Sequence, residues 1–208
     1  KNVFGQYFGN FDINLIMCNN FNNPEGAEPK KMKLINKRIV IGSEPNKDKK
    51  INSESLKSYS GNDIIECRAL YSNNQIEFYP NFKILLLCND KPKLDENDEA
   101  LWKRCINIDF PTTFVKNPKN ENEKKINLDL KKEIKYWNND FMLLLISYYE
   151  RYKNEGLELT EEIEQNIVNY QNTNNHYEEF VDEFLKFSGN KNDYVKWQNL
   201  NVHYKKWF

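Results

Sequence analysis

The chain has 208 residues, enough for one domain of ordinary size and a small second one. Its 30 Lys and Arg residues nearly balance 31 Asp and Glu residues, and a net charge of −1 excludes binding of nucleic acid or an anionic membrane through bulk basicity. No segment approaches the roughly 20 apolar residues of a membrane-spanning helix, so we expect a soluble intracellular protein without a membrane partner.

Two apolar runs predict parallel strands at the centre of an α/β sheet. The first, 37–44, ends at Glu44, and the second, 82–88, is followed by Asn89. Neither run alternates apolar and polar residues, which is typical of strands covered on both faces. A third short run, 105–110, predicts a further strand. Because ligands of such sheets bind beyond the carboxyl ends of the strands, Glu44 and Asn89 are candidate site residues.

The residue types at these two strand ends suit work on phosphate groups. A carboxylate such as Glu44 can hold a magnesium-bound water or polarise an attacking water. An amide such as Asn89 can orient water or contact a phosphate without adding negative charge. The alternatives are that Glu44 only begins a solvated loop and that Asn89 is an ordinary residue before a turn.

The segments 64–71 and 76–78 predict a β-hairpin with a polar tip. A hairpin can bring cations and amides against a phosphate backbone, so this region is the best candidate for a nucleic-acid surface. The candidate DNA-binding residues are Lys57, Arg68, Asn73 and Asn74. The alternative is that the tip is polar only because hairpin tips usually are.

Arg104 is one of four arginines in a lysine-rich chain and precedes the third apolar run. A guanidinium at a subunit edge could reach the phosphates of a nucleotide held by a neighbouring subunit. The alternative is a surface ion pair with the acidic run 95–99, which would contribute little to stability.

The composition changes after the third run. The segment 116–127 is charged and predicts a linker. Apolar residues from Leu130 to Tyr152 recur every three or four positions, which predicts one long amphipathic helix that Gly156 ends. A shorter helix is expected after Thr160.

A further helix is expected between Asn175 and Phe187, because Asn175 and Glu178 resemble a capping box. The chain then divides into four parts: a core over 1–115, a linker over 116–127, a helical extension over 128–190, and the start of a small unit, which could be a winged helix, over 191–208.

Several motifs occur in a characteristic order: KRIVIGSEP at 37–45, SGND at 60–63, RALY at 68–71, the run 83–89, and WKR at 102–104. Together they resemble the superfamily III helicase domain of viral and phage helicase-primases, nearest to the poxvirus and giant-virus type. The resemblance implies an α/β fold, with a partial AAA+-like parallel-sheet ATPase core followed by a C-terminal helical region. It also implies an ATP-dependent DNA helicase that uses ATP and Mg²⁺, binds single-stranded or forked DNA and assembles as a homo-hexamer at a viral replication site.

By the same resemblance, Glu44 stands at the Walker B acidic position and holds magnesium indirectly. Asn89 stands at the polar sensor and Arg104 at the arginine finger, while 57–68 leads into the hairpin that contacts single-stranded DNA. Glu44, Asn89 and Arg104 are therefore the predicted catalytic residues.

The chain contains no G-x-x-x-x-G-K-[ST] loop, whose backbone amides bind nucleotide phosphates. The resemblance places that loop upstream of Lys1, so we expect a fragment of a longer protein that is inactive by itself. The alternative is a non-catalytic DNA-binding or assembly module derived from such an ATPase.

Overall fold

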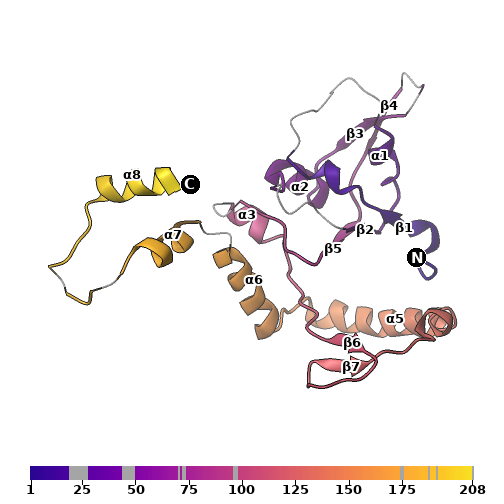
Figure 1. Ribbon diagram of the computed structural model, residues 1–208. Helices are drawn as coiled ribbons and strands as arrows, with labels where there is room; N and C mark the ends of the chain where they lie inside the picture. The colour runs from indigo at the N-terminus through magenta and orange to yellow at the C-terminus, as the bar shows by residue number, and fades with distance from the viewer. Residues whose placement is uncertain are drawn as a thin grey trace.

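The computed structural model describes residues 1–18, 28–43, 50–69, 71, 74–95, 98–173, 176–186, 188–190 and 192–207. A three-stranded parallel sheet lies at the centre of the N-terminal half (Figure 1). Its strands stand in the order β1 (Phe8–Asn10), β2 (Ile39–Ser43) and β5 (Lys83–Leu87). The predicted α/β class with parallel strands is therefore confirmed.

The strands β2 and β5 correspond to the two predicted apolar runs, but their faces are not equally covered. In β2, Val40 is fully buried and Ile41 is half-buried. In β5, Leu85 and Leu87 are 48% and 56% exposed. The expectation of cover on both faces was wrong for β5, because the described part of the chain packs nothing over the face that carries Leu85 and Leu87.

A hairpin and three short helices accompany the sheet. The predicted hairpin is confirmed, since β3 (Ile65–Arg68) and β4 (Gln75–Phe78) pair antiparallel. Asn52 begins α2 (Ser53–Ser60), because its side chain accepts a hydrogen bond of 2.8 Å from the backbone N–H of Ser55. The remaining elements are the 3-10 turns Gly5–Tyr7 and Ile13–Leu15, α1 (Pro29–Met32) and α3 (Glu99–Trp102).

Two features near the sheet differ from the sequence predictions. The run 105–110, predicted as a third strand, has no regular secondary structure, and its Ile106 and Ile108 are 49% and 59% exposed. An apolar run becomes a strand only when another strand supplies its hydrogen-bond partners, and none of the described segments does so here. Conversely, β1 was not predicted, because three residues that include Gly9 are too short to show a period.

The hydrophobic core lies between the sheet and these helices. Its five largest fully buried side chains are Ile16, Leu34, Val40, Ile51 and Leu101. Tyr170, from the C-terminal half, also belongs to this core. Burial of this apolar area is the main favourable contribution to folding, and Tyr170 ties α6 to it.

The C-terminal half is mostly helical. It contains β6 (Thr113–Val115), β7 (Glu123–Lys125), α4 (Leu130–Glu133), α5 (Asn138–Glu155), α6 (Glu161–Thr173), α7 (His176–Phe184) and α8 (Trp197–Trp207). The range predicted as a linker thus includes β7, which pairs in parallel with β6. Where residues are described, none of the helices has the length and apolarity to cross a membrane.

The helix predictions for this half are borne out in part. The expected long helix is interrupted between α4 and α5, and Gly156, with φ of 81°, ends α5 as predicted. The helix expected after Thr160 is α6. The next helix, α7, ends at Phe184, and both expected limits, Asn175 and Phe187, lie outside the described residues.

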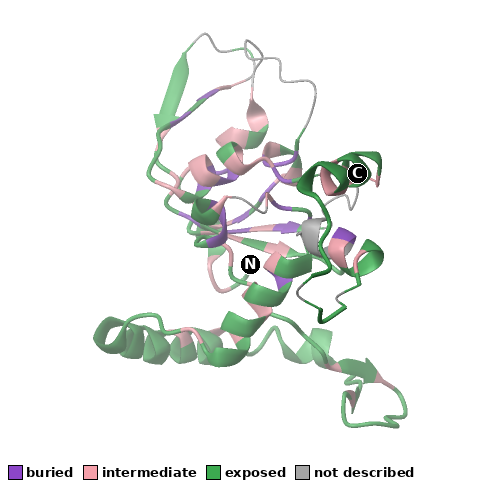
Figure 2. Cartoon of the chain, turned by 90° about the vertical axis from the view of Figure 1, so that its left-hand side faces the viewer, coloured by how far each residue is buried: buried purple, intermediate pink, exposed green. Residues whose placement is uncertain are grey.

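The apolar face of α5 is not buried. No residue of this helix is buried, and Figure 2 shows it exposed along its length. Phe141, Leu144 and Tyr148 are 44%, 50% and 59% exposed. The predicted helix is confirmed over α5, but the described part of the chain covers no apolar face of it.

The difference in burial predicts that a substitution in the core lowers stability more than one on α5. Leu34 is 1% exposed and Leu143 is 65% exposed. Leu34→Ala should lower the free energy of unfolding by about 2–5 kcal/mol, since it removes buried apolar contacts and leaves a cavity. Leu143→Ala should change it by less than about 0.5 kcal/mol. Urea denaturation measures both, and equal effects would contradict the assigned core.

Candidate functional site

The carboxyl ends of β2 and β5 lie side by side. The parallel register pairs Ser43 with Leu87, the last residues of the two strands. Glu44 follows Ser43 directly but lies outside the described residues, whereas Asn89 is exposed two positions after Leu87. The structure therefore places side by side the two strand ends that precede Glu44 and Asn89 in the chain. The roles of these two residues stay predictions.

The segments that follow the two strands meet again beyond this edge. Lys50 and Lys93 form a parallel β-bridge, and the backbone N–H of Ile51 donates to the Lys93 carbonyl at 2.9 Å. The Lys50 ammonium lies 3.3 Å from the Asp95 carboxylate. These contacts hold the start of α2 close to the segment that leads into α3.

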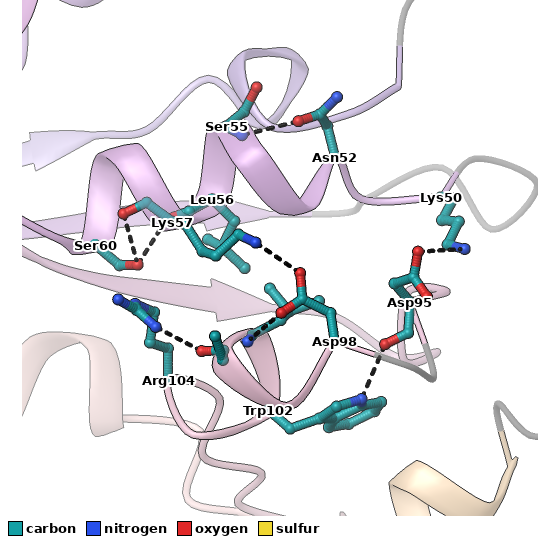
Figure 3. Close-up of polar contacts among 12 residues, drawn as sticks. Lys50, Asn52, Ser55, Leu56, Lys57, Ser60, Asp95, Asp98, Trp102 and Arg104 are labelled. Atoms are coloured by element: carbon teal, nitrogen blue, oxygen red, sulfur yellow. Dashed lines mark hydrogen bonds and ion pairs between the residues drawn. The ribbon is translucent and has the colours of Figure 1, made fainter. Parts of the chain in front are cut away.

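Asp98 joins α2 to α3 with its two carboxylate oxygens (Figure 3). Oδ1 accepts a hydrogen bond of 3.1 Å from the backbone N–H of Leu101, which caps α3. Oδ2 accepts a hydrogen bond of 2.8 Å from the Lys57 ammonium on α2. The hydrogen bond from Lys57 is the main reason that the pKa of Asp98 lies below its ordinary value of 3.8.

Arg104 lies just after α3 and is exposed. Its Nη1 donates a hydrogen bond of 2.6 Å to the carbonyl of Ala100, one helical turn earlier (Figure 3). Burial raises the pKa of the neighbouring Cys105 thiol to about 11, so this thiol is neutral at pH 7.

Trp102 fixes the other side of α3. Its indole N–H donates a hydrogen bond of 2.9 Å to the Asp95 carbonyl. Its ring packs edge-to-face against Tyr170 of α6, with centroids 5.2 Å apart. The Tyr170 hydroxyl in turn donates to the carbonyl of Pro92. The helix that precedes Arg104 is therefore held by α2 on one side and by α6 on the other.

The predicted DNA-binding residues divide between two places. Arg68 ends β3 and pairs with Gln75 of β4, and Asn74 is exposed directly before β4. Asn73 lies outside the described residues. Lys57 lies on α2 with its ammonium on Asp98. The hairpin carries Arg68 and Asn74 to its distal end, while Lys57 belongs to the contact between α2 and α3.

Asp98 stands in the acidic run 95–99, and no role was predicted for it. A local pattern could have found its capping role, because Asp before Glu-Ala-Leu is typical of a helix N-terminus. Its ion pair with Lys57 joins residues far apart in the chain, and no local pattern predicts such a contact.

The residue types expected after the two strands match only part of a nucleotide site. An amide and a carboxylate would suit the terminal phosphate and its magnesium-bound water, but Glu44, the carboxylate, lies outside the described residues. The chain holds no glycine-rich loop to surround the phosphates. The part of the chain that the structure describes also has no group of three His, Cys, Asp or Glu side chains that could hold a metal ion.

Comparison with known proteins points to viral helicases. The chain is 26% identical over 222 residues to a protein of Acanthamoeba polyphaga mimivirus named "putative helicase", across all of this chain and 22% of that protein. It is 29% identical over 202 residues to a protein of the same description from Sputnik virophage, across 92% of this chain and 26% of that protein. Another, from Frog virus 3, is 39% identical over 80 residues, which are 38% of this chain and 8% of that protein.

The chain thus spans about a quarter or less of the length of these relatives. No family model matches it. Similarity to several viral proteins of this description supports a viral helicase family, and the mixed α/β structure with parallel strands is compatible with an ATPase-like fold.

The ion pair between Lys57 and Asp98 should make stability depend on pH. Because folding lowers the pKa of Asp98, the stabilisation is complete above about pH 4 and is lost as the pH falls through the folded-state pKa. Asp98→Asn keeps a capping oxygen but cannot ionise. The difference in unfolding free energy between the wild-type chain and Asp98→Asn should therefore shrink below about pH 4. A difference that stays constant in denaturation curves from about pH 6 to pH 3 would contradict this assignment.

Proposed function

We propose that this chain is part of an ATP-dependent viral DNA helicase of the superfamily III type, with an AAA+-like core. The observation that carries the proposal is the pairing of Ser43 with Leu87, because it aligns the strand ends that lie one residue before Glu44 and two residues before Asn89. The similarity to viral proteins described as helicases supports the same reading.

In the proposed mechanism, residues of this chain act on the terminal phosphate of ATP. Glu44 polarises the attacking water and accepts its proton, and Asn89 orients that water through its amide. ATP with Mg²⁺ supplies a phosphoanhydride whose hydrolysis releases the free energy for movement. The loop that surrounds the other phosphates is proposed to come from sequence upstream of this chain, so the chain alone should not hydrolyse ATP.

Arg104 is proposed to act on a nucleotide bound by the neighbouring subunit of a homo-hexamer. Among the described contacts, Arg104 is exposed just after α3 and its guanidinium donates to a backbone carbonyl of that helix, Ala100. A guanidinium in such a position can neutralise charge that develops on the transferred phosphoryl group.

The hairpin of β3 and β4 is proposed to contact single-stranded DNA. Arg68 and Asn74 lie at the end of the hairpin away from Ile65 and Phe78, which pair at its base. A cation and amides at that end suit a phosphate backbone without reading the sequence of the bases. Hydrolysis would then move the hairpin along one DNA strand.

The catalytic part of the proposal is tested in a longer protein that joins this chain to upstream sequence with a phosphate-binding loop. Glu44→Gln should lower kcat of DNA-stimulated ATPase about 10²–10⁴-fold, because glutamine has nearly the same size as glutamate but cannot act as the general base. Arg104→Ala should lower it about 10³-fold or more. Glu54→Gln, on the exposed first turn of α2, is the matched control and should have no effect.

Activity that survives Glu44→Gln would refute the catalytic proposal. Absence of ATPase from the longer protein would favour a non-catalytic DNA-binding or assembly module derived from such an ATPase.

DNA binding is tested by the salt dependence of affinity for single-stranded DNA. Arg68→Ala should weaken binding and lower the slope of log affinity against log salt by about 0.7, the value for one phosphate contact on a single strand. Arg151→Ala should leave the slope unchanged, since Arg151 lies on α5 and bonds Glu155 at 2.7 Å. An unchanged slope for Arg68→Ala in a fluorescence anisotropy titration would remove Arg68 from the DNA surface.

A further inference from the structure

The contact between α2 and α3 is suited to set the position of Arg104. Asp98 precedes the first residue of α3, and its carboxylate satisfies the Leu101 N–H and the Lys57 ammonium at once. The Asp98 side chain is 20% exposed and that of Lys57 is 32% exposed. This pair is therefore less screened by solvent than the pair of Lys103 and Glu99 on the same helix, whose side chains are 77% and 88% exposed and whose charged atoms lie 3.6 Å apart.

The Arg104 guanidinium depends on α3 for its orientation. Its Nη1 bonds the Ala100 carbonyl at 2.6 Å, and Ala100 lies in the single turn that Asp98 caps. A shift or loss of that turn would move the carbonyl and release the guanidinium. The capping carboxylate thus acts on Arg104 through the backbone of α3, without touching it.

Lys57 connects this turn to the edge of the sheet. It lies on α2, and Asn52, which caps α2, donates its backbone N–H to the Ile16 carbonyl at 2.7 Å. The preceding residue, Ile51, is hydrogen-bonded to Lys93 in the segment that leaves β5. A continuous set of contacts therefore runs from the segments beyond the carboxyl ends of the strands, through α2 and Asp98, to Arg104.

We propose that the ion pair of Lys57 with Asp98 positions the Arg104 guanidinium and couples it to the segments around Ile51 and Lys93, beyond the strand ends Ser43 and Leu87. This inference rests on the proposed function in giving Arg104 a role at a neighbouring subunit's nucleotide. It makes Lys57 a positioning residue rather than a DNA contact, because its ammonium already bonds a carboxylate at 2.8 Å.

The structural part of the inference is tested by NMR on this chain, labelled with ¹⁵N-arginine. Its four arginines give four side-chain Nε–H signals, and Arg151, bonded to Glu155, provides an internal control. Lys57→Met and Asp98→Asn should each shift the Arg104 signal and lower its heteronuclear NOE, while the Arg151 signal stays unchanged. Lys103→Met, on the exposed pair of the same helix, should change neither. If neither Lys57→Met nor Asp98→Asn changes the chemical shift or the NOE of the Arg104 signal, the inference is overturned, and this result does not depend on ATPase activity.

The functional part is tested in the longer protein. Lys57→Met and Asp98→Asn should lower kcat for ATP, by up to about 10²-fold, with an unchanged KM, because a misplaced group impairs the reaction and not the binding of nucleotide. Lys57→Arg, which keeps the charge, should restore most of kcat. On an Arg104→Ala background, Lys57→Met should have no further effect on kcat, whereas a merely structural role would lower activity in both backgrounds.

Three results would overturn the inference and leave the proposed function standing. The first is a normal kcat for Lys57→Met. The second is a further fall in kcat when Lys57→Met is added to Arg104→Ala. The third is a fall, in Lys57→Met, of the slope of log DNA affinity against log salt by the value of one phosphate contact. If Arg104→Ala or Glu44→Gln leaves ATPase intact, the proposed function fails, and the NMR measurement still decides whether the pair positions Arg104.

Discussion

Parallel pairing of β2 with β5 is the interaction on which the rest of the structure depends. It aligns two strands that are far apart in the chain, so that Ser43 and Leu87 end at the same place. The segments beyond them then pair again through Lys50 and Lys93. A shift of this register by one residue would turn Val40 away from the core, and the energetic cost of exposing it keeps the two carboxyl ends aligned.

A second set of contacts holds the short helix α3 in place. A helix of four residues has almost no stability of its own, because nucleation is costly and few backbone hydrogen bonds form. It is held in place by Leu101 in the core, by Asp98 at its start and by the packing of Trp102 against Tyr170. Such an element can carry an exposed guanidinium in a defined position and still respond to movement of its neighbours.

The local parts of this fold could be predicted from sequence. The apolar runs predicted β2 and β5, a polar tip between two β-rich segments predicted the hairpin, and Gly156 predicted the end of α5. The predicted long helix was correct over α5, although it is interrupted between α4 and α5. Each of these features depends on residues within a few positions of one another, where period, turn residues and capping preferences are informative.

By itself, the sequence determined the strands with their polar ends, the hairpin, the helical C-terminal half and the kinds of residue that could act on phosphate. Only the tertiary structure decided that Ser43 ends beside Leu87, that the run 105–110 finds no strand partner among the described residues, and that Lys57 bonds Asp98. The physical reason is separation along the chain. A hydrogen bond or an ion pair needs two groups within about 3–4 Å, and for distant residues that distance is set by how the whole core packs.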